Sequence, residues 1–190
     1  MDRRSFLAWA TNGMGALFAT VLGVPAALYL LDPLNRKAPD SSWRTVANLD
    51  DLQQDVPFEA VLQDTRWDAW NLYPNEIVGR VWLIRHDDGH EDKVKAFTSV
   101  CPHLGCSVNW LAAPAGEPAT SGQFLCPCHG GRFDHNGQRV EHGPATNPAP
   151  RNMDSLEVQI VPDQDNPSNK VVQVKYLRFQ ANQERKDVAS

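Results

Sequence analysis

The stretch CPCHGGRFD, residues 126–134, holds two cysteines and one histidine within four positions. A related stretch, CPHLGC, occupies residues 101–106. All four cysteines of the chain lie in these two boxes, which indicates a metal or cofactor site rather than a framework of scattered disulfides. A structural zinc site is one interpretation, but zinc needs four ligands, whereas the boxes offer six, and Cys-x-His is short for a zinc finger.

The pattern C-x-H-x-x-C with C-x-C-H closely resembles the Rieske iron–sulfur proteins, and the resemblance covers the whole chain. Rieske centres are [2Fe–2S] clusters with two cysteines on one iron and two histidines on the other. The resemblance implies one cluster per chain, and it implies a disulfide between the two remaining cysteines, as in the quinol-oxidising branch of the family. The implied iron ligands are Cys101, His103, Cys126 and His129, and the implied disulfide is Cys106–Cys128.

The same resemblance implies an electron-transfer subunit of a quinol–cytochrome c oxidoreductase, which is not an enzyme alone. It would take an electron and a proton from a membrane quinol and pass the electron to a c-type cytochrome. Its partners would be cytochrome b, that cytochrome, quinol and membrane lipid, within a dimeric multi-subunit complex. The catalytic, quinol-facing residues would be His103 and His129, and Leu104 would dock at the exposed cluster edge. The alternatives are the small Rieske subunit of a molybdenum oxidase such as arsenite oxidase, or a zinc-stabilised interaction module.

Two positions that follow the histidine within the stretch 126–134 bear on the redox potential. In high-potential members of the family, serine follows His-Gly and tyrosine stands two residues later, and their hydroxyls donate to cluster sulfur atoms. Here those positions are Gly131 and Phe133. Loss of both donors predicts a low potential, suited to menaquinol rather than ubiquinol; the alternative is that both are packing variants.

A third, proline-rich loop shields the cluster in this family. Here it reads GPATNPAPRN, residues 143–152, and is longer than the usual Gly-Pro-Ala-Pro. Either half of it could cover the cluster, so the candidates are Gly143, Pro144, Pro148 and Pro150. The remaining histidines match no ligand position and are predicted to be surface or turn residues, namely His86, His90, His135 and His142.

The N-terminal region predicts a membrane anchor. Residues 9–31 form a moderately apolar run of 23 residues, long enough to cross about 30 Å of hydrocarbon. The preceding residues, RRSFL at 3–7, resemble a twin-arginine export signal. We therefore expect a retained single-pass anchor in the bacterial cytoplasmic (inner) membrane, with the globular head on the extracytoplasmic side.

The rest of the chain predicts an all-β head, a Rieske-type antiparallel β-sandwich with a cluster-binding subdomain. Short alternating or apolar runs at 81–85, 93–97, 156–161 and 171–179 indicate strands, the last two as a hairpin. The expected organisation is a signal and anchor at 1–31, a flexible hinge at 32–42, a head at 43–180 with its cluster-binding part at about 98–152, and a frayed tail at 181–190. A formal net charge of −5 argues against nucleic acid as a partner.

Overall fold

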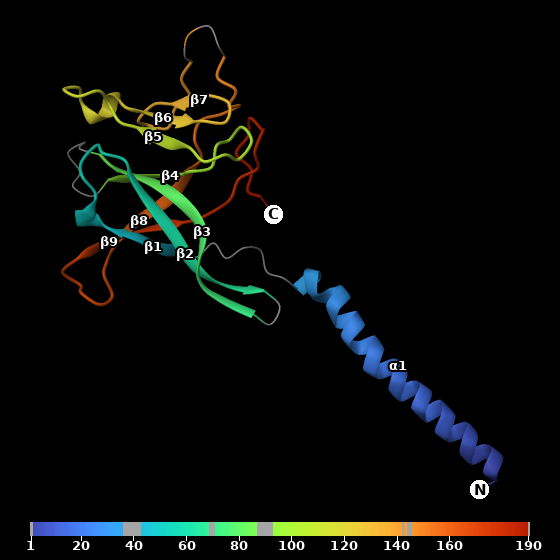
Figure 1. Cartoon of the computed structure of the whole chain (residues 1–190). Coiled ribbons are helices and arrows are strands. Elements are labelled where there is room, and N and C mark those ends of the chain that lie inside the picture. The colour runs from blue at the N-terminus through green and yellow to red at the C-terminus, as the bar shows by residue number, and fades with distance from the viewer. Residues whose placement is uncertain are drawn as a thin grey trace. The chain divides into compact units, whose positions relative to one another are not determined.

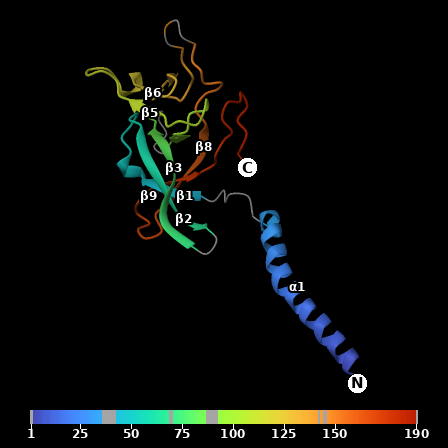
Figure 2. The same cartoon turned by 45° about the vertical axis from the view of Figure 1, so that its right-hand side comes forward.

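The computed structural model describes residues 2–35, 43–68, 71–86, 93–141, 143 and 146–189. The chain divides into two units, Met1–Asp40 and Ser41–Ser190, which are described separately. Figures 1 and 2 show the first as a single helix and the second as an assembly of strands.

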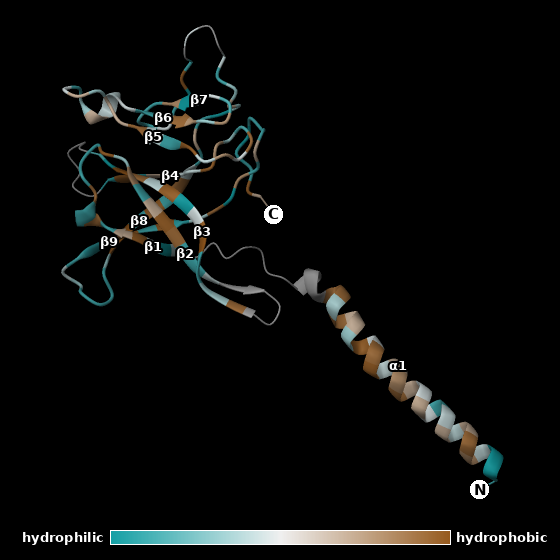
Figure 3. Cartoon of the chain, viewed as in Figure 1, coloured by the Kyte–Doolittle hydropathy of each residue, from teal (hydrophilic) through white to brown (hydrophobic). Residues whose placement is uncertain are grey.

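Helix α1 runs from Arg3 to Asn35. Its stretch Arg3–Leu31 has a mean hydropathy of 1.9 and is the one helix among the described residues long and apolar enough to span a membrane. Figure 3 shows the apolar character along most of the helix. The hydroxyls of Thr11 and Thr20 donate to the carbonyls of Leu7 and Ala16, which satisfies these polar groups within the helix. The helix includes residues 32–35, which we assigned to the hinge, and residues 36–42 lie outside the described part of the chain.

The second unit contains a six-stranded antiparallel sheet, here called the base, whose order is β1-β9-β8-β4-β3-β2. Strands β4 and β8 pair at only two positions, so the base consists of two three-stranded halves connected by a short β4–β8 pairing. The side chains of Arg44 and Asp64 connect β1 to β2, and the sheet is therefore barrel-like. The strands are β1 Trp43–Asn48, β2 Phe58–Asp68, β3 Asn71–Arg85, β4 Val94–Thr98, β8 Ser155–Pro162 and β9 Lys170–Lys175.

A smaller sheet of three short strands, in the order β5-β6-β7, lies beyond one end of the base in Figures 1 and 2. Its strands are β5 Asn109–Leu111, β6 Gln123–Cys126 and β7 Gly131–Phe133. We call residues 99–152, which include this sheet, the cluster-binding part. Two 3-10 turns complete the head: η1 Leu49–Asp51 precedes β2, and η2 Ala119–Ser121 lies in the loop before β6.

Residues 81–84 of strand β3 are buried on both faces of the sheet, which explains this run of apolar residues. Alternate side chains of a strand point to opposite faces. Val81 and Leu83 pack into the core inside the base, whereas Trp82 and Ile84 pack into a second core shared with the cluster-binding part. The indole N–H of Trp82 donates to the carbonyl oxygen of Val108, 3.0 Å away, and so ties the two parts together.

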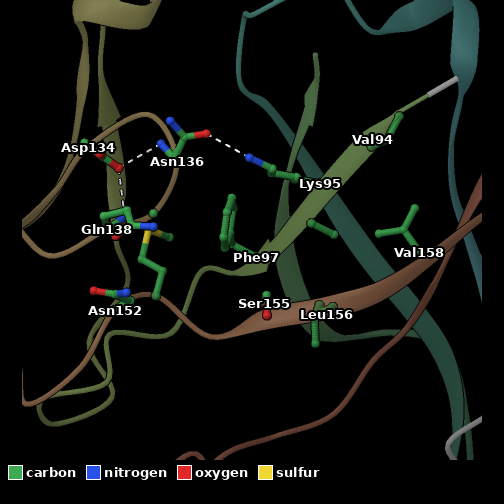
Figure 4. Close-up of a pocket in the computed structure, with 13 residues that line it drawn as sticks. Val94, Lys95, Phe97, Asp134, Asn136, Gln138, Asn152, Ser155, Leu156 and Val158 are labelled. Atoms are coloured by element: carbon green, nitrogen blue, oxygen red, sulfur yellow. Dashed lines mark hydrogen bonds between the residues drawn. The ribbon is translucent and has the colours of Figure 1, made fainter. Parts of the chain in front are cut away.

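A groove of about 750 Å³ marks the other side of this junction, between β4, β8 and the turn after β7. Figure 4 shows Lys95 reaching across it, with its ammonium 2.9 Å from Oδ1 of Asn136. The turn itself is held by Asp134, whose Oδ1 accepts from the backbone N–H groups of Asn136 and Gln138. The base and the cluster-binding part are therefore bridged by polar as well as apolar contacts.

The all-β class and the pairing of β8 with β9 are confirmed. Residues 181–189, which we expect to form a frayed tail, make backbone contacts with the preceding residues. The backbone N–H of Gln180 donates to Asp187 and that of Ala189 to Arg178, and Phe179 forms a bridge with Val188. The polar side chains did not predict these contacts, because backbone hydrogen bonds hold the segment in place.

Candidate metal centre

The two cysteine boxes fold into two turns of similar construction. In the first, the backbone N–H of Gly105 donates to the carbonyl of Cys101, and in the second that of Gly130 donates to Cys126, both at 3.0 Å. Gly105 and Gly130 have φ values of 81° and 76°, a left-handed conformation that glycine adopts at low cost. Each turn thereby places its first cysteine and its histidine on one short loop.

The four implied ligands meet with the thiols inside and the imidazoles outside. Cys101 and Cys126 are 1% and 2% exposed and are the two free cysteines. His103 is half-buried and His129 is exposed, and their ring centroids lie 4.8 Å apart with the rings nearly perpendicular. Two buried thiols beside two accessible imidazoles match the donor set of a Rieske cluster.

Burial at Cys101 makes a free thiolate unfavourable. Burial raises the pKa of Cys101 to about 12, although hydrogen bonds from the backbone of His103 and Leu104 act in the opposite direction. A thiolate at this position needs positive charge nearby, and a coordinated metal supplies it. The amide donors from the first box are also placed to stabilise the ligand sulfur.

A disulfide joins Cys106 to Cys128, the pair implied by the resemblance, and so links the two boxes across 22 residues of sequence. It lies within the same turns as the ligands, because each of its cysteines follows or precedes a ligand histidine by only a few positions. The two ligand loops are therefore held to one another covalently as well as by packing.

Gly131 and Phe133 both lie against the ligand cysteines. A Cβ atom added to Gly131 would be 3.6 Å from Cβ of Cys126 and 3.8 Å from Sγ of Cys101, which are ordinary contact distances. Phe133 is fully buried in the core that contains both cysteines. The backbone here leaves space beside the sulfur atoms, and the residues present fit a cluster.

The second half of the proline-rich loop packs against this centre. Ala149, between Pro148 and Pro150, is 1% exposed and belongs to the core around the ligand cysteines. Pro148 and Pro150 are half-buried, whereas Gly143 is exposed, and Pro144 lies outside the described residues.

Asn147 is a residue of this loop that our sequence reasoning missed. Its amide donates to the carbonyls of Arg132 and Val140, at 2.6 and 2.8 Å, and its Oδ1 accepts from the N–H of Ala149. It is only 6% exposed and lies 3.6 Å from the position of a Cβ at Gly131. Asn147 therefore holds the third loop against the second box, and a polar residue between prolines was the only signal for it.

The predictions for the remaining side chains have mixed outcomes. Leu104 is 56% exposed beside His103. His135 lies in a turn, as predicted, but it is not on the surface: it is 3% exposed and its Nε2 lies 2.8 Å from the carbonyl oxygen of Asp55. His86 is half-buried, and His90 and His142 fall outside the described residues.

Comparison with known proteins identifies the family. Residues 42–166 match the Rieske [2Fe-2S] domain. The chain is 28% identical over 148 residues to the menaquinol:cytochrome c reductase iron-sulfur subunit of Bacillus subtilis (strain 168), covering 78% of this chain and 82% of that protein. It is 26% identical to the cytochrome b6-f complex iron-sulfur subunit of Chlorobaculum thiosulfatiphilum, covering 73% and 62% respectively. A structure of the quaternary ammonium Rieske monooxygenase CntA with L-carnitine aligns at 20% identity and a TM-score of 0.41, covering 70% of this chain and 32% of that one. The chain belongs to the Rieske [2Fe-2S] domain family and carries a [2Fe–2S] cluster.

Proposed function

We propose that the chain is the electron-transfer subunit of a quinol–cytochrome c oxidoreductase, which accepts one electron and one proton from menaquinol and delivers the electron to a c-type cytochrome. The observation that carries the proposal is the pair of accessible imidazoles, His103 and His129, set over two buried thiols. The relative from Bacillus subtilis is itself a menaquinol:cytochrome c reductase subunit, which supports the choice of reaction.

The bound cluster supplies a one-electron acceptor. The accessible imidazole of His103 or His129 accepts a hydrogen bond from the quinol hydroxyl and holds the proton that leaves with the electron. Metal charge makes a coordinated imidazole a stronger acid, so its protonation follows the charge at the centre. Leu104, exposed beside His103, provides an apolar edge for docking against a cytochrome b surface.

Gly131 and Phe133 set the potential of this centre in the low part of the Rieske range. A hydrogen bond to a charged group contributes roughly 1.5–3 kcal/mol, and about 1.4 kcal/mol corresponds to ~59 mV for one electron. Two missing donors to the reduced cluster therefore lower the potential by on the order of 100–200 mV. A low potential suits menaquinol, which is a stronger reductant than ubiquinol.

The membrane arrangement follows from the N-terminal sequence. The twin-arginine pattern at residues 3–7 directs the folded head across the bacterial cytoplasmic membrane, and α1 remains as its anchor. The partners are then cytochrome b and a cytochrome c on the extracytoplasmic side, in a dimeric complex. The head moves between them on the tether that follows α1.

The test is purification of the membrane complex that contains the full chain, followed by reduction with menaquinol and with ubiquinol. We expect menaquinol to produce the EPR signal of a reduced Rieske cluster and then to reduce a c-type haem, with cytochrome b in the preparation. A complex that contains a molybdopterin protein and no cytochrome b would assign the chain to a molybdenum oxidase instead. Absence of an EPR signal from a zinc-containing protein would refute both.

A further inference from the structure

Three side chains with metal-binding groups meet at the junction of the base and the cluster-binding part. They are Asp55, His86 and His135, and one ligand atom from each lies within 4.8 Å of the others. Asp55 lies in the connection between η1 and β2, His86 follows β3, and His135 follows β7. The three come from separate regions of the sequence, and none of them is part of the iron–sulfur centre.

Asp55 is the residue around which this group is built. Its φ is 57°, an uncommon left-handed conformation that aspartate tolerates better than most residues. Its backbone N–H donates to the carbonyl of Arg85, 2.8 Å away, and this contact brings it beside His86. Its own carbonyl is 2.8 Å from Nε2 of His135. Asp55 therefore contacts both the end of β3, next to His86, and the side chain of His135.

The spacing between Asp55 and His86 fits two ligands of one ion better than it fits a hydrogen bond. Oδ1 of Asp55 and Nδ1 of His86 are 3.5 Å apart. Good N–H···O bonds measure about 2.7–3.2 Å. Two ligand atoms at about 2.0–2.1 Å from a tetrahedral zinc ion are separated by about 3.3 Å. The observed distance of 3.5 Å is close to this separation of about 3.3 Å between two zinc ligands.

The hydrogen bond of His135 fixes the tautomer of its neutral ring. A carbonyl oxygen only accepts, so Nε2 of His135 carries the proton in its bond to Asp55. In the neutral ring the lone pair is then on Nδ1. Metal-binding histidines commonly donate their other N–H to a backbone carbonyl, which fixes the tautomer and the ring orientation.

The surroundings of His135 restrict its movement. The residue is 3% exposed, and its ring lies at 5.8 Å from the ring of Trp110 and at 5.5 Å from that of His86, measured between centroids. The carboxylate of Asp55, by contrast, is 34% exposed. The group is thus rigid on the histidine side and open to solvent on the aspartate side, where an ion could enter and retain a water molecule.

We propose that Asp55, His86 and His135 form a second metal site, for a divalent transition cation of the zinc class. Two imidazoles select such ions over Ca²⁺ and Mg²⁺, which prefer oxygen ligands. The site joins the base to the cluster-binding part, because His135 belongs to the second and the other two residues to the first. The bound ion stabilises the junction and takes no part in electron transfer.

The experiment uses the full chain in detergent with its cluster present, dialysed against EDTA and then equilibrated with Zn²⁺. Iron and zinc are measured together by mass spectrometry. We expect one zinc per two irons, and a higher melting temperature with Zn²⁺ but not with Ca²⁺. Asp55→Asn and His86→Gln should each weaken zinc binding at least ~10-fold, the lower end of what loss of a supporting partner costs. Asp50→Asn, in η1, is the matched control and should bind normally.

Iron content and the EPR spectrum show whether each variant has folded with its cluster. If one of the two variants does not fold, the other still tests the proposal. Unchanged zinc binding in both Asp55→Asn and His86→Gln would overturn the proposal. So would zinc that increases only as iron decreases, because that ion would occupy the cysteine boxes. Loss of zinc in Asp50→Asn would also count against it, since binding would then depend on surface charge alone.

Discussion

At the scale of residues, the low redox potential that we propose for the centre depends on two positions in its buried core. Gly131 contributes no side chain beside Cys101, and Phe133 presents an apolar ring in the same buried core. Backbone groups of His103 and Leu104 already donate toward Cys101. In the proposed function, the hydrogen bonds that distinguish this centre from a high-potential one are those of two absent hydroxyls, and both can be restored by substitution.

Gly131→Ser combined with Phe133→Tyr should raise the midpoint potential by on the order of 100–200 mV, because each new hydroxyl stabilises the more negative reduced cluster. The added Cβ at residue 131 meets no atom closer than 3.6 Å, so the serine fits. The measurement is a redox titration followed by EPR. Phe58→Tyr, in strand β2 of the base, is the control and should leave the potential unchanged. An intact cluster with an unshifted potential in the double variant would show that residues 131 and 133 affect packing only.

At the scale of elements, the C-terminal segment supports the first ligand loop. The backbone N–H of Asn182 donates to the carbonyl of Pro102, 2.8 Å away, and Pro102 stands between two cluster ligands in the sequence. Arg151 holds this segment by donating to the carbonyls of Gln180 and Gln183 at 2.8 and 2.5 Å. The same guanidinium forms a bidentate pair with Asp154, at 2.9 Å for each bond. A short polar segment thereby connects the proline-rich loop to the first box.

Arg151→Ala should lower the free energy of unfolding by about 3–5 kcal/mol, because Asp154 would remain as a buried carboxylate without its partner. The two side chains are only 9% and 4% exposed, and the ion pair raises the pKa of Arg151. Denaturant unfolding measures the change, and the cluster should be lost faster on storage. Arg185→Ala is the control, since the ion pair of Arg185 with Asp187 is solvent-exposed. Equal losses in the two variants would mean that the buried pair has no special role.

For the whole molecule, the essential feature is a head joined to a membrane helix by a short segment. Helix α1 ends at Asn35 and β1 begins at Trp43, which leaves seven residues, 36–42, between them. Seven residues span at most about 25 Å when extended. In the proposed function, the length and the stiffness of this segment limit how far the cluster can move between a quinol site and a haem.

Deletion of residues 38–40 should slow quinol:cytochrome c turnover in the purified complex while the EPR spectrum and the potential of the cluster stay unchanged. The deletion shortens the reach of the tether without touching the head. Replacement of the same three residues by Gly-Ser-Gly keeps the length and should preserve turnover. If the deleted form turns over at the normal rate, electron transfer does not require movement on this tether.

Local spacing made much of the centre predictable. The four ligands and Cys106–Cys128 lie in two short boxes, so few residues of sequence carry the whole pattern. The apolar run at 81–85 predicted part of β3, although the strand begins at Asn71. Residues 72–75 of the strand are exposed and alternate only weakly between apolar and polar. Strands β5, β6 and β7 were not predicted, because three or four residues are too few to show a period.

The sequence by itself determined the family, the apolar helix and the candidate donor set, because these depend on residue identity over short stretches. Only the tertiary structure decided that His135 is buried against Asp55, that Asn182 supports the loop of Pro102, and that Asn147 packs beside Gly131. Each of these contacts joins residues that are 16 or more positions apart in the chain. Such pairs come together through the packing of the base against the cluster-binding part, and no local pattern of residue types records it.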